Sequence, residues 1–332
     1  MSRPSTIVLA RVAVAVASAG AALLGAELAI RWLAPVPQLF PQWQWDALPT
    51  DWRSEYEVDS DIGYRPVLGS GEYTKFGTVR NEYPVDKAAG VTRVLFLGDS
   101  VTHRWRIQRV FVNRCAGQPV EFWNAGVEGF NTGQQVEYYL RWNRRIEPDH
   151  VTLLFHNNDF VATPVAFRDD QGQLTIANPQ AYLSRRDVDW AARSHLYRHY
   201  LRIRTARAVE EDPITSVAET REALAKLKAA LDAEGVGFNV ILVPVLKPLA
   251  EWTEYESRSR SASLEIFGEL GVPVFDLIHP LTEAAERGLD LHETPGDIWH
   301  PNDEISRRFA RHAIRKGYLE VVLPPDGCPG AT

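Results

Sequence analysis

The chain has 332 residues, of which 45% are hydrophobic and 24% are charged, a balance typical of a globular protein that buries a large core. Its formal net charge of -7 argues against nucleic acid as a partner, because binding phosphates needs clustered Lys and Arg. The two cysteines, Cys115 and Cys328, are far apart and lack the spacing of metal ligands. The sequence therefore predicts no zinc site and leaves a single disulfide open.

The N-terminal segment departs most from this average composition. Val12–Ile30 contains no Lys or Arg and is long enough to span a bilayer as a helix. Arg3 and Arg11 precede this stretch, whereas residues 32–52 contain no basic side chain. The positive-inside rule then places the N-terminus in the cytoplasm. We therefore predict a single-pass anchor in the inner membrane over residues 1–33, with the rest of the chain periplasmic or extracellular.

Two alternatives exist for this segment. The triplet ASA at 17–19 resembles a signal-peptidase site, and cleavage there would release a chain that begins at Gly20. The apolar run continues well past that position, so the uncleaved anchor is favoured. Glu27 is costly inside a membrane span unless it is paired or near the interface, and Arg31, four residues later, offers a partner.

Two stretches follow the anchor. Residues 34–60 are rich in Pro, Trp and Asp without a helical period, which indicates a stalk or a segment lying on a domain surface. Residues 61–92 place Tyr, Val and Thr between glycines, which predicts short strands or a hairpin. Together they form a juxtamembrane stalk and N-terminal extension over 34–92.

From Arg93 onward, apolar runs of strand length alternate with helical patterns. This alternation predicts a parallel sheet with helices on both faces, in which ligands bind at the carboxyl ends of the strands. The predicted strands are 93–97, 120–124, 151–155, 238–245 and 272–277, and the predicted helices are 132–146, 217–234, 256–269 and 303–315.

The stretch 160–216 interrupts this rhythm. It contains DDQGQ, which predicts a turn, and the aromatic and basic run SHLYRHYLRIR at 194–204, without a clear strand. We expect a helical insertion that lies over the site or against the membrane, and an amphipathic surface helix with solvated arginines is the equal alternative. Residues 321–332 form a C-terminal tail.

Four short polar clusters lie in this pattern, and the first three directly follow predicted strands. In a parallel sheet those three converge on one edge. Each cluster alone has a plain explanation, such as a loop or a helix cap by Asn131 or Thr132. The clusters are GDS (98–100), NAGVEGFNTGQ (124–134), HNND (156–159) and GDIWHPND (296–303).

Taken together, these clusters contain every group of a serine-nucleophile site. A serine needs an imidazole to accept its proton, a carboxylate to orient the imidazole, and donors for the oxyanion. Ser100 provides the hydroxyl, and His300 and Asp297, three residues apart, provide the imidazole and the carboxylate. The glycine and asparagine clusters provide hydrogen-bond donors.

The ordered blocks GDS, NAGVEG, HNND and DIWH resemble those of the SGNH, or GDSL-like, hydrolase superfamily. A single block is a weak signal, but four blocks in order are a specific one. The match covers roughly residues 93–318, and we assign the hydrolase domain to 93–320. The resemblance implies an α/β fold: a three-layer α/β/α, flavodoxin-like sandwich with a five-stranded, mainly parallel sheet, here preceded by the transmembrane helix.

The resemblance also implies roles for individual residues. Ser100 is expected to be the nucleophile, His300 the general base, and Asp297 the group that orients the imidazole. The expected oxyanion donors are the backbone N–H of Ser100, the backbone N–H of Gly129 and the side-chain amide of Asn158. Such a mechanism requires no metal and no organic cofactor.

Several assignments around these residues stay open. Gly126 competes with Gly129 as the backbone donor. His156 stands where the family usually has glycine, and a steric or structural role is favoured over that of a second titratable group. Asp99 and His103 are candidate site neighbours, although His103 on a helix could equally face solvent. Asp159 is expected to support its loop.

The sequence therefore predicts a membrane-anchored, extracytoplasmic serine esterase that hydrolyses an acyl ester, with O-acetyl as one option. The substrate is an acylated small molecule, lipid or glycan, and protein partners stay open. Two rivals remain: an O-acyltransferase in cell-surface polysaccharide modification, which would keep the same site, and a noncatalytic glycan-binding or assembly protein on the same fold.

Overall fold

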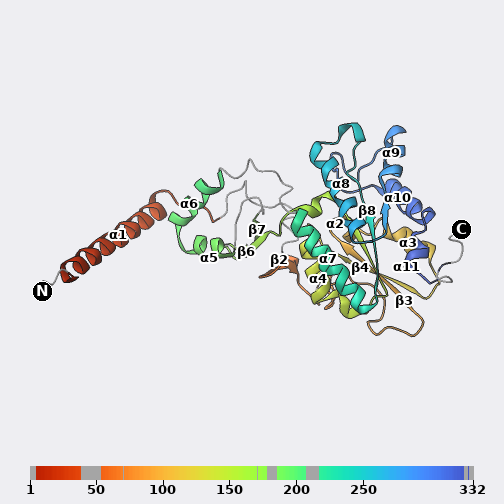
Figure 1. Cartoon of the computed structure of the whole chain (residues 1–332), viewed down its shortest axis with the longest axis horizontal. Coiled ribbons are helices and arrows are strands. Elements are labelled where there is room, and N and C mark those ends of the chain that lie inside the picture. Colours follow the sequence, from red (N-terminus) through yellow and green to blue (C-terminus); the bar gives the residue numbers. More distant parts are fainter. Residues whose placement is uncertain are drawn as a thin grey trace. The chain divides into compact units, whose positions relative to one another are not determined.

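The computed structural model describes residues 5–38, 54–69, 71–169, 171–177, 185–206, 217–324 and Cys328. The chain divides into two compact units (Figure 1). The first, called the anchor unit, combines residues 1–46 with 164–211. The second, called the sheet unit, combines residues 47–163 with 212–332.

The sheet unit is built on a five-stranded parallel sheet in the order β4-β3-β5-β8-β9. This is the flavodoxin-like order, and it confirms the predicted fold class. Because β3 pairs with β4 on one side and β5 on the other, the chain reverses its direction of winding beside the end of β3. The strands are β3 (Thr92–Gly98), β4 (Val120–Gly126), β5 (His150–Phe155), β8 (Gly237–Leu242) and β9 (Val274–Asp276).

The strands are apolar on both faces, as a covered parallel sheet requires. In β3, Val94 and Phe96 pack into the core on one face of the sheet, and Leu95 and Leu97 pack into the core on the other. All six residues of β5 are buried. The apolar runs that predicted these strands are therefore explained by helices on both sides.

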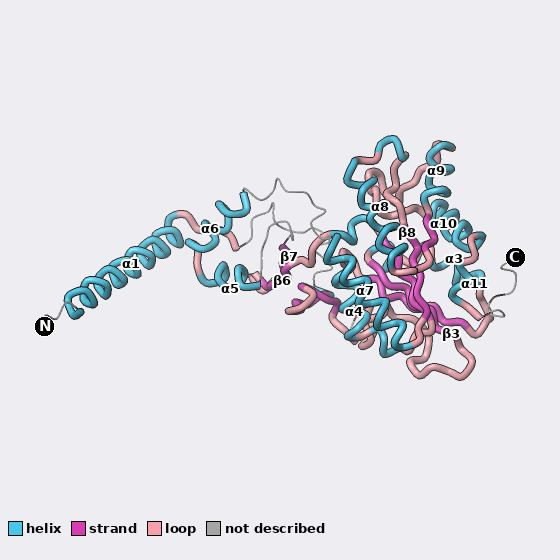
Figure 2. Tube along the Cα trace, viewed as in Figure 1, coloured by secondary structure: helices cyan, strands magenta, loops and turns pink. Residues whose placement is uncertain are grey.

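Two groups of helices cover these faces (Figure 2). One group is α3 (Gln108–Arg114), α9 (Ile278–Glu286), α10 (Asp303–Arg315) and α11 (Tyr318–Val322); the other is α4 (Thr132–Arg141), α7 (Val217–Glu234) and α8 (Glu254–Glu269). The four predicted helices are present. The one predicted over 132–146 is divided into α4 and the 3-10 turn Asn143–Ile146, and α9 was not predicted.

The N-terminal extension forms an antiparallel hairpin of β1 (Tyr56–Asp59) and β2 (Gly63–Pro66). Residues 56–59 pair in this hairpin within the sheet unit, which fits the second expectation for 34–60, a segment lying on a domain surface. Residues 39–53 of the predicted stalk lie outside the described residues. The extension also contacts the sheet, since the Val79 N–H donates to the carbonyl of Asn124 at 2.8 Å.

The anchor unit contains α1 (Ser5–Leu33), α5 (Arg185–Arg193), α6 (His195–Ala206) and a hairpin of β6 (Val165–Arg168) and β7 (Leu174–Ala177). The expectation of an insertion without a strand was wrong. The predicted turn is present in the described residues: Gly172 has a φ of 78°, and Asp169 accepts from the N–H of Gln171 and Gln173. Four-residue strands were too short to give a clear alternation.

Within the described residues, one helix is long and apolar enough to cross a membrane: Val8–Leu33, inside α1. None of its most apolar window is buried against protein. Glu27 and Arg31 pair at 2.9 Å, as the spacing predicted.

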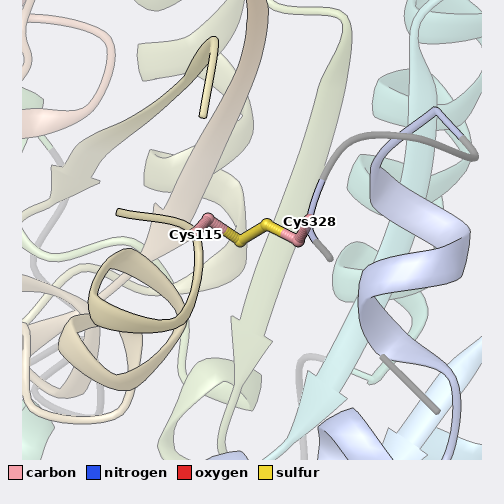
Figure 3. The surroundings of a disulfide bond; sticks show 2 residues. All are labelled: Cys115 and Cys328. Atoms are coloured by element: carbon pink, nitrogen blue, oxygen red, sulfur yellow. A yellow bond between two sulfur atoms is a disulfide. The ribbon is translucent and has the colours of Figure 1, made fainter. Parts of the chain in front are cut away.

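A disulfide joins Cys115, at the end of α3, to Cys328 in the C-terminal tail (Figure 3). The two Cα atoms are 5.2 Å apart, and the bond spans 213 residues of sequence. Cys115 is buried in the core beneath α3 and α11. This settles the pairing that the sequence had left open.

Removing the disulfide should lower the stability of the sheet unit. The bond closes a long loop, so its loss raises the entropy of the unfolded chain and costs roughly 2–5 kcal/mol. We expect Cys328→Ser to lower Tm by at least about 4 °C in thermal melts. A reductant should destabilise the wild-type chain and leave the variant unchanged; an equal effect of the reductant on both would contradict the prediction.

Candidate active site

Three of the predicted site residues form a continuous hydrogen-bonded chain. The Ser100 Oγ and the His300 Nε2 are 2.7 Å apart, and the His300 Nδ1 is 2.7 Å from the Asp297 Oδ2. Ser100 follows β3, whereas the other two lie in the loop that precedes α10. The structure therefore brings together residues two hundred positions apart.

The Asp297 carboxylate is held by its own loop. Its Oδ1 accepts from the backbone N–H of Trp299 at 3.0 Å and of His300 at 3.1 Å. Burial alone would raise the pKa of Asp297, but the hydrogen bonds from His300 and Trp299 outweigh burial and hold its pKa below the usual value. The carboxylate is therefore charged at neutral pH and can fix the tautomer of the imidazole.

Ser100 opens the short helix α2 (Ser100–His103) directly after β3. Asp99 caps this helix, because its Oδ1 accepts from the N–H of Val101 at 2.9 Å. Gly98 makes the tight turn with a φ of 154°, and a Cβ there would lie 2.2 Å from the Thr102 Oγ1. Glycine at this position therefore allows α2 to begin immediately at the strand end.

Gly126 ends β4 in direct contact with α2. A Cβ at this position would lie 2.3 Å from the backbone nitrogen of His103, so the two backbones touch. The Gly126 N–H donates to the Asn124 Oδ1 at 2.9 Å, and its carbonyl accepts from the Tyr73 hydroxyl at 3.1 Å. Its N–H is thus already used within the protein.

Gly129 differs from Gly126 in this respect. It has a φ of 70°, in the left-handed region that favours glycine. In the part of the chain that the structure describes, its N–H donates to no backbone or side-chain acceptor, and neither does the N–H of Ser100. These two N–H groups are available to a ligand.

The HNND cluster lies between the end of β5 and the 3-10 turn Asn157–Phe160. The half-buried Asn158 donates from Nδ2 to the Asp99 Oδ2 at 2.9 Å, which orients its amide beside the turn 98–100. Asp159 supports the loop: it accepts from the N–H of His156 at 2.6 Å and from Gln135 at 2.5 Å. Burial raises the pKa of Asp99, and burial with the charge of Asp99 raises the pKa of Asp159.

His156, for which the sequence favoured a steric or structural role, is buried and packs edge-on against Trp299, with ring centroids 5.0 Å apart. Burial lowers the pKa of His156 to about 4, and the charge of His300 acts in the same direction. The ring is therefore neutral at physiological pH. Through Trp299, it contacts the loop that carries His300.

His103 does not face solvent, so that alternative was wrong. It is partly buried and lies between two carboxylates, with Nδ1 3.3 Å from the Glu128 Oε1 and Nε2 3.3 Å from the Glu72 Oε1. Its ring stacks on Tyr73 at a centroid distance of 5.9 Å. Burial disfavours the charged imidazolium, but Glu128 and Glu72 outweigh it and raise the pKa of His103 to about 9.

A set of ion pairs that the sequence did not predict links the residues after α2 to the loop that carries His300. Arg104 and Arg106 both bind Glu293, the second at 2.6 Å, and Arg106 also binds Asp303 at 2.5 Å. The Glu293 N–H in turn donates to the carbonyl of His300 at 2.9 Å. No sequence signal pairs Arg104 and Arg106 with a glutamate so far along the chain.

Among the described residues, no three His, Cys, Asp or Glu side chains gather in a way that could hold a metal ion. What the arrangement provides is a hydroxyl bonded to an oriented imidazole, with free N–H donors beside it. Such a set can add an oxygen nucleophile to a carbonyl carbon.

No protein-family model matches the chain, and no curated protein matches it. Solved structures similar in fold include Axe2, an acetylxylan esterase from Geobacillus stearothermophilus, with 13% identity over 71% of this chain and 95% of that chain (TM-score 0.45). Another is LAE5, an alpha/beta hydrolase enzyme from the metagenome of Lake Arreo, Spain, with 14% identity over 71% of this chain and 96% of that chain (TM-score 0.46). A third is TesA, with 13% identity over 70% of this chain and 100% of that chain (TM-score 0.42). These values are too low to carry an activity or a substrate over to this chain.

Adding a methyl group at Gly126 should disrupt the site. Because a Cβ there would overlap the backbone of α2, Gly126→Ala should displace Ser100 and lower both Tm and reaction with a serine-directed probe. Gly268→Ala is the matched control, since nothing lies within 4 Å of a Cβ at that helical position. Equal labelling and equal Tm for the two variants would contradict the close approach.

The charge on His103 should make stability depend on pH at the alkaline side. Its folded pKa of about 9 lies above the ordinary value of 6.5, so its contribution is complete below about pH 6.5 and is lost as pH rises through 9. Denaturant titrations should show the free energy of unfolding falling over this window in the wild type. That fall should be smaller in His103→Gln, and an unchanged fall would refute the assignment.

Proposed function

We propose that this protein is a serine esterase that works through an acyl-enzyme. The observation that carries the proposal is the hydrogen-bonded chain from Ser100 through His300 to Asp297, at 2.7 Å for each step. It lies at the carboxyl edge of a parallel sheet, beside the switch point, where ligands bind in such folds.

The geometry supports a specific sequence of proton and bond changes. The Ser100 Oγ attacks the ester carbonyl while the His300 Nε2 accepts its proton, and Asp297 stabilises the imidazolium that forms. His300 then protonates the departing alcohol oxygen, which leaves the acyl group on Ser100. Water, deprotonated by His300, then attacks this acyl-enzyme. His300 returns that proton to the Ser100 Oγ as the bond from Oγ to the acyl carbon breaks, so the acid leaves and the enzyme returns to its starting state.

Three donors are proposed for the oxyanion: the N–H of Ser100, the N–H of Gly129 and the Asn158 amide. The first two donate to no protein acceptor among the described residues. Asn158 uses one of its two amide hydrogens on Asp99, which leaves the second for a ligand. The bond between the Gly126 N–H and Asn124 supports Gly129 over Gly126 as the backbone donor.

We further propose that the esterase is anchored in the inner membrane by α1 and acts outside the cytoplasm. The apolar length of Val8–Leu33 and the two arginines at its N-terminal end, Arg3 and Arg11, support this orientation. The disulfide between Cys115 and Cys328 supports it independently, since such bonds persist mainly in oxidising compartments. Substrates of that location are acylated glycans and lipids of the cell envelope, with O-acetyl or another short acyl group.

The test uses the full-length protein in detergent micelles. We expect a fluorophosphonate probe to label the wild type, and short acyl esters to be hydrolysed, with both activities absent in Ser100→Ala. Ser261→Ala, an exposed serine on α8, is the matched control and should behave as the wild type. Labelling that persists in Ser100→Ala would refute the assigned nucleophile. Transfer of the acyl group to an added sugar in preference to water would redefine the reaction as a transferase.

The two asparagines of HNND should differ sharply in their effect on turnover. Asn158→Ala removes a proposed oxyanion donor and should lower kcat by roughly a hundredfold or more. Asn157→Ala should have much less effect, because the Asn157 side chain makes no hydrogen bond within the described residues. Steady-state kinetics on one short ester checks both. Comparable losses in the two variants would overturn the proposed role of Asn158.

A further inference from the structure

Glu27, the one acidic residue in the apolar helix α1, is engaged by the insertion. Its carboxylate accepts from the backbone N–H groups of His195 and Leu196, both at 2.9 Å, and from the Ser194 hydroxyl at 2.8 Å. These groups form the N-terminus of α6, whose free N–H groups and helix dipole favour a negative charge. Glu27 therefore acts as a docking residue between α1 and α6.

Further contacts attach the insertion to the same end of α1. Arg31 donates to the carbonyl of Arg193 at 3.1 Å, and the backbone N–H of Val36 donates to the His195 Nδ1 at 3.1 Å. Arg198, which is buried, donates to the carbonyl of Val36 at 3.0 Å. Apolar packing joins them: Val36 and Ile30 lie in one cluster with Val188, Ala191 and Leu201.

The position of these contacts along α1 sets their depth in a membrane. Val8–Leu33 has 26 residues, which as a helix measures about 39 Å. The hydrocarbon core is only about 30 Å thick, so about 9 Å of helix, shared between the two ends, extends into the headgroup layers. Glu27 lies six residues before Leu33, or about 9 Å along the axis. In a centred span Glu27 is therefore within about one helical turn of the boundary of the hydrocarbon core, so the insertion is attached near the membrane surface.

The exposed face of the insertion suits that environment. An aromatic chain runs from Trp190 on α5 through Tyr197 to Tyr200 on α6, with ring centroids 6.2 Å and 5.5 Å apart. Trp190, Tyr200 and Ile203 are each more than half exposed, at 55%, 52% and 56%. Tyr200 and Ile203 lie three residues apart, on one face of α6. Exposed Trp and Tyr beside basic residues are typical of segments in the interfacial layer.

We propose that α5 and α6 form an interfacial platform, docked on α1 through Glu27, with Trp190, Tyr200 and Ile203 inserted among the lipid headgroups of the outer leaflet. This rests on the proposed membrane anchor but not on the esterase activity. The chain is then attached to the membrane by the span α1 and by the helix pair α5 and α6 at its surface. Glu27 is tolerated in the apolar helix because its carboxylate accepts hydrogen bonds from the start of α6.

The test places a fluorophore on single introduced cysteines in the full-length protein, reconstituted in vesicles that contain lipids brominated near the headgroup. The native cysteines are disulfide-bonded and do not react with the label. Tyr200→Cys and Ile203→Cys should be quenched by the bromolipid. Ala192→Cys, about 200° around α5 from Trp190, and Arg307→Cys, on α10 of the sheet unit, should not be quenched.

A fluorophore on Leu24→Cys, inside the span, tests the anchor separately from the platform. It should be quenched by lipids brominated deep in the acyl chain. Quenching of Leu24 without quenching of Tyr200 and Ile203 would overturn the platform and leave the anchor intact. No quenching of Leu24 would overturn both. Equal quenching at Ala192 and Arg307 would indicate general adsorption and would also overturn the platform.

Glu27→Leu then tests the docking contact, because leucine keeps the helix apolar and removes the acceptor of all three bonds. Quenching at Tyr200 should fall while quenching at Leu24 stays unchanged, and Glu27→Gln, which keeps one carbonyl acceptor, should show a smaller loss. An unchanged signal at Tyr200 in Glu27→Leu would refute the role of Glu27.

Discussion

The candidate site depends on how closely α2, which begins at Ser100, lies against the neighbouring strand ends. Neither Gly98 nor Gly126 has room for a Cβ, since one would meet the Thr102 side chain and the other the backbone of His103. This contact sets α2 directly on the end of β4. Two other parts of the site bond to residues at the start of α2. The Asn158 amide donates to Asp99, and the His300 imidazole is hydrogen-bonded to the Ser100 hydroxyl.

Charged groups then hold the surrounding loops at the same edge. His103 lies between Glu128 and Glu72, which ties the helix that carries Ser100 to the glycine loop and to the N-terminal extension. On the other side, Arg104 and Arg106 bind Glu293 next to the loop that carries His300. Glu128 is buried, and a buried charge is costly unless it is paired, so its contact with His103 favours the present position of the glycine loop.

The anchor unit satisfies its own partly buried charge in the same way. Glu27 would be costly in an apolar helix, yet three donors at the start of α6 and the side chain of Arg31 satisfy its carboxylate. In the sequence, Glu27 argues against a membrane span more than any other residue. In the structure, Glu27 joins α1 to the insertion. The charge of Glu27 is tolerated because its partners come from the same unit.

The sequence by itself determined the five buried strands, the main helices and the four blocks with Ser100, Asn158 and His300, because strand periodicity and strand-end motifs are local properties of the chain. Only the tertiary structure decided which donors are free, that His103 is enclosed by carboxylates, that Cys115 pairs with Cys328, and that Glu27 accepts from α6. Each of these depends on partners distant along the chain. Hydrogen bonds and ion pairs of that kind leave no periodic signal, since they exist only once the strand order has brought the loops together.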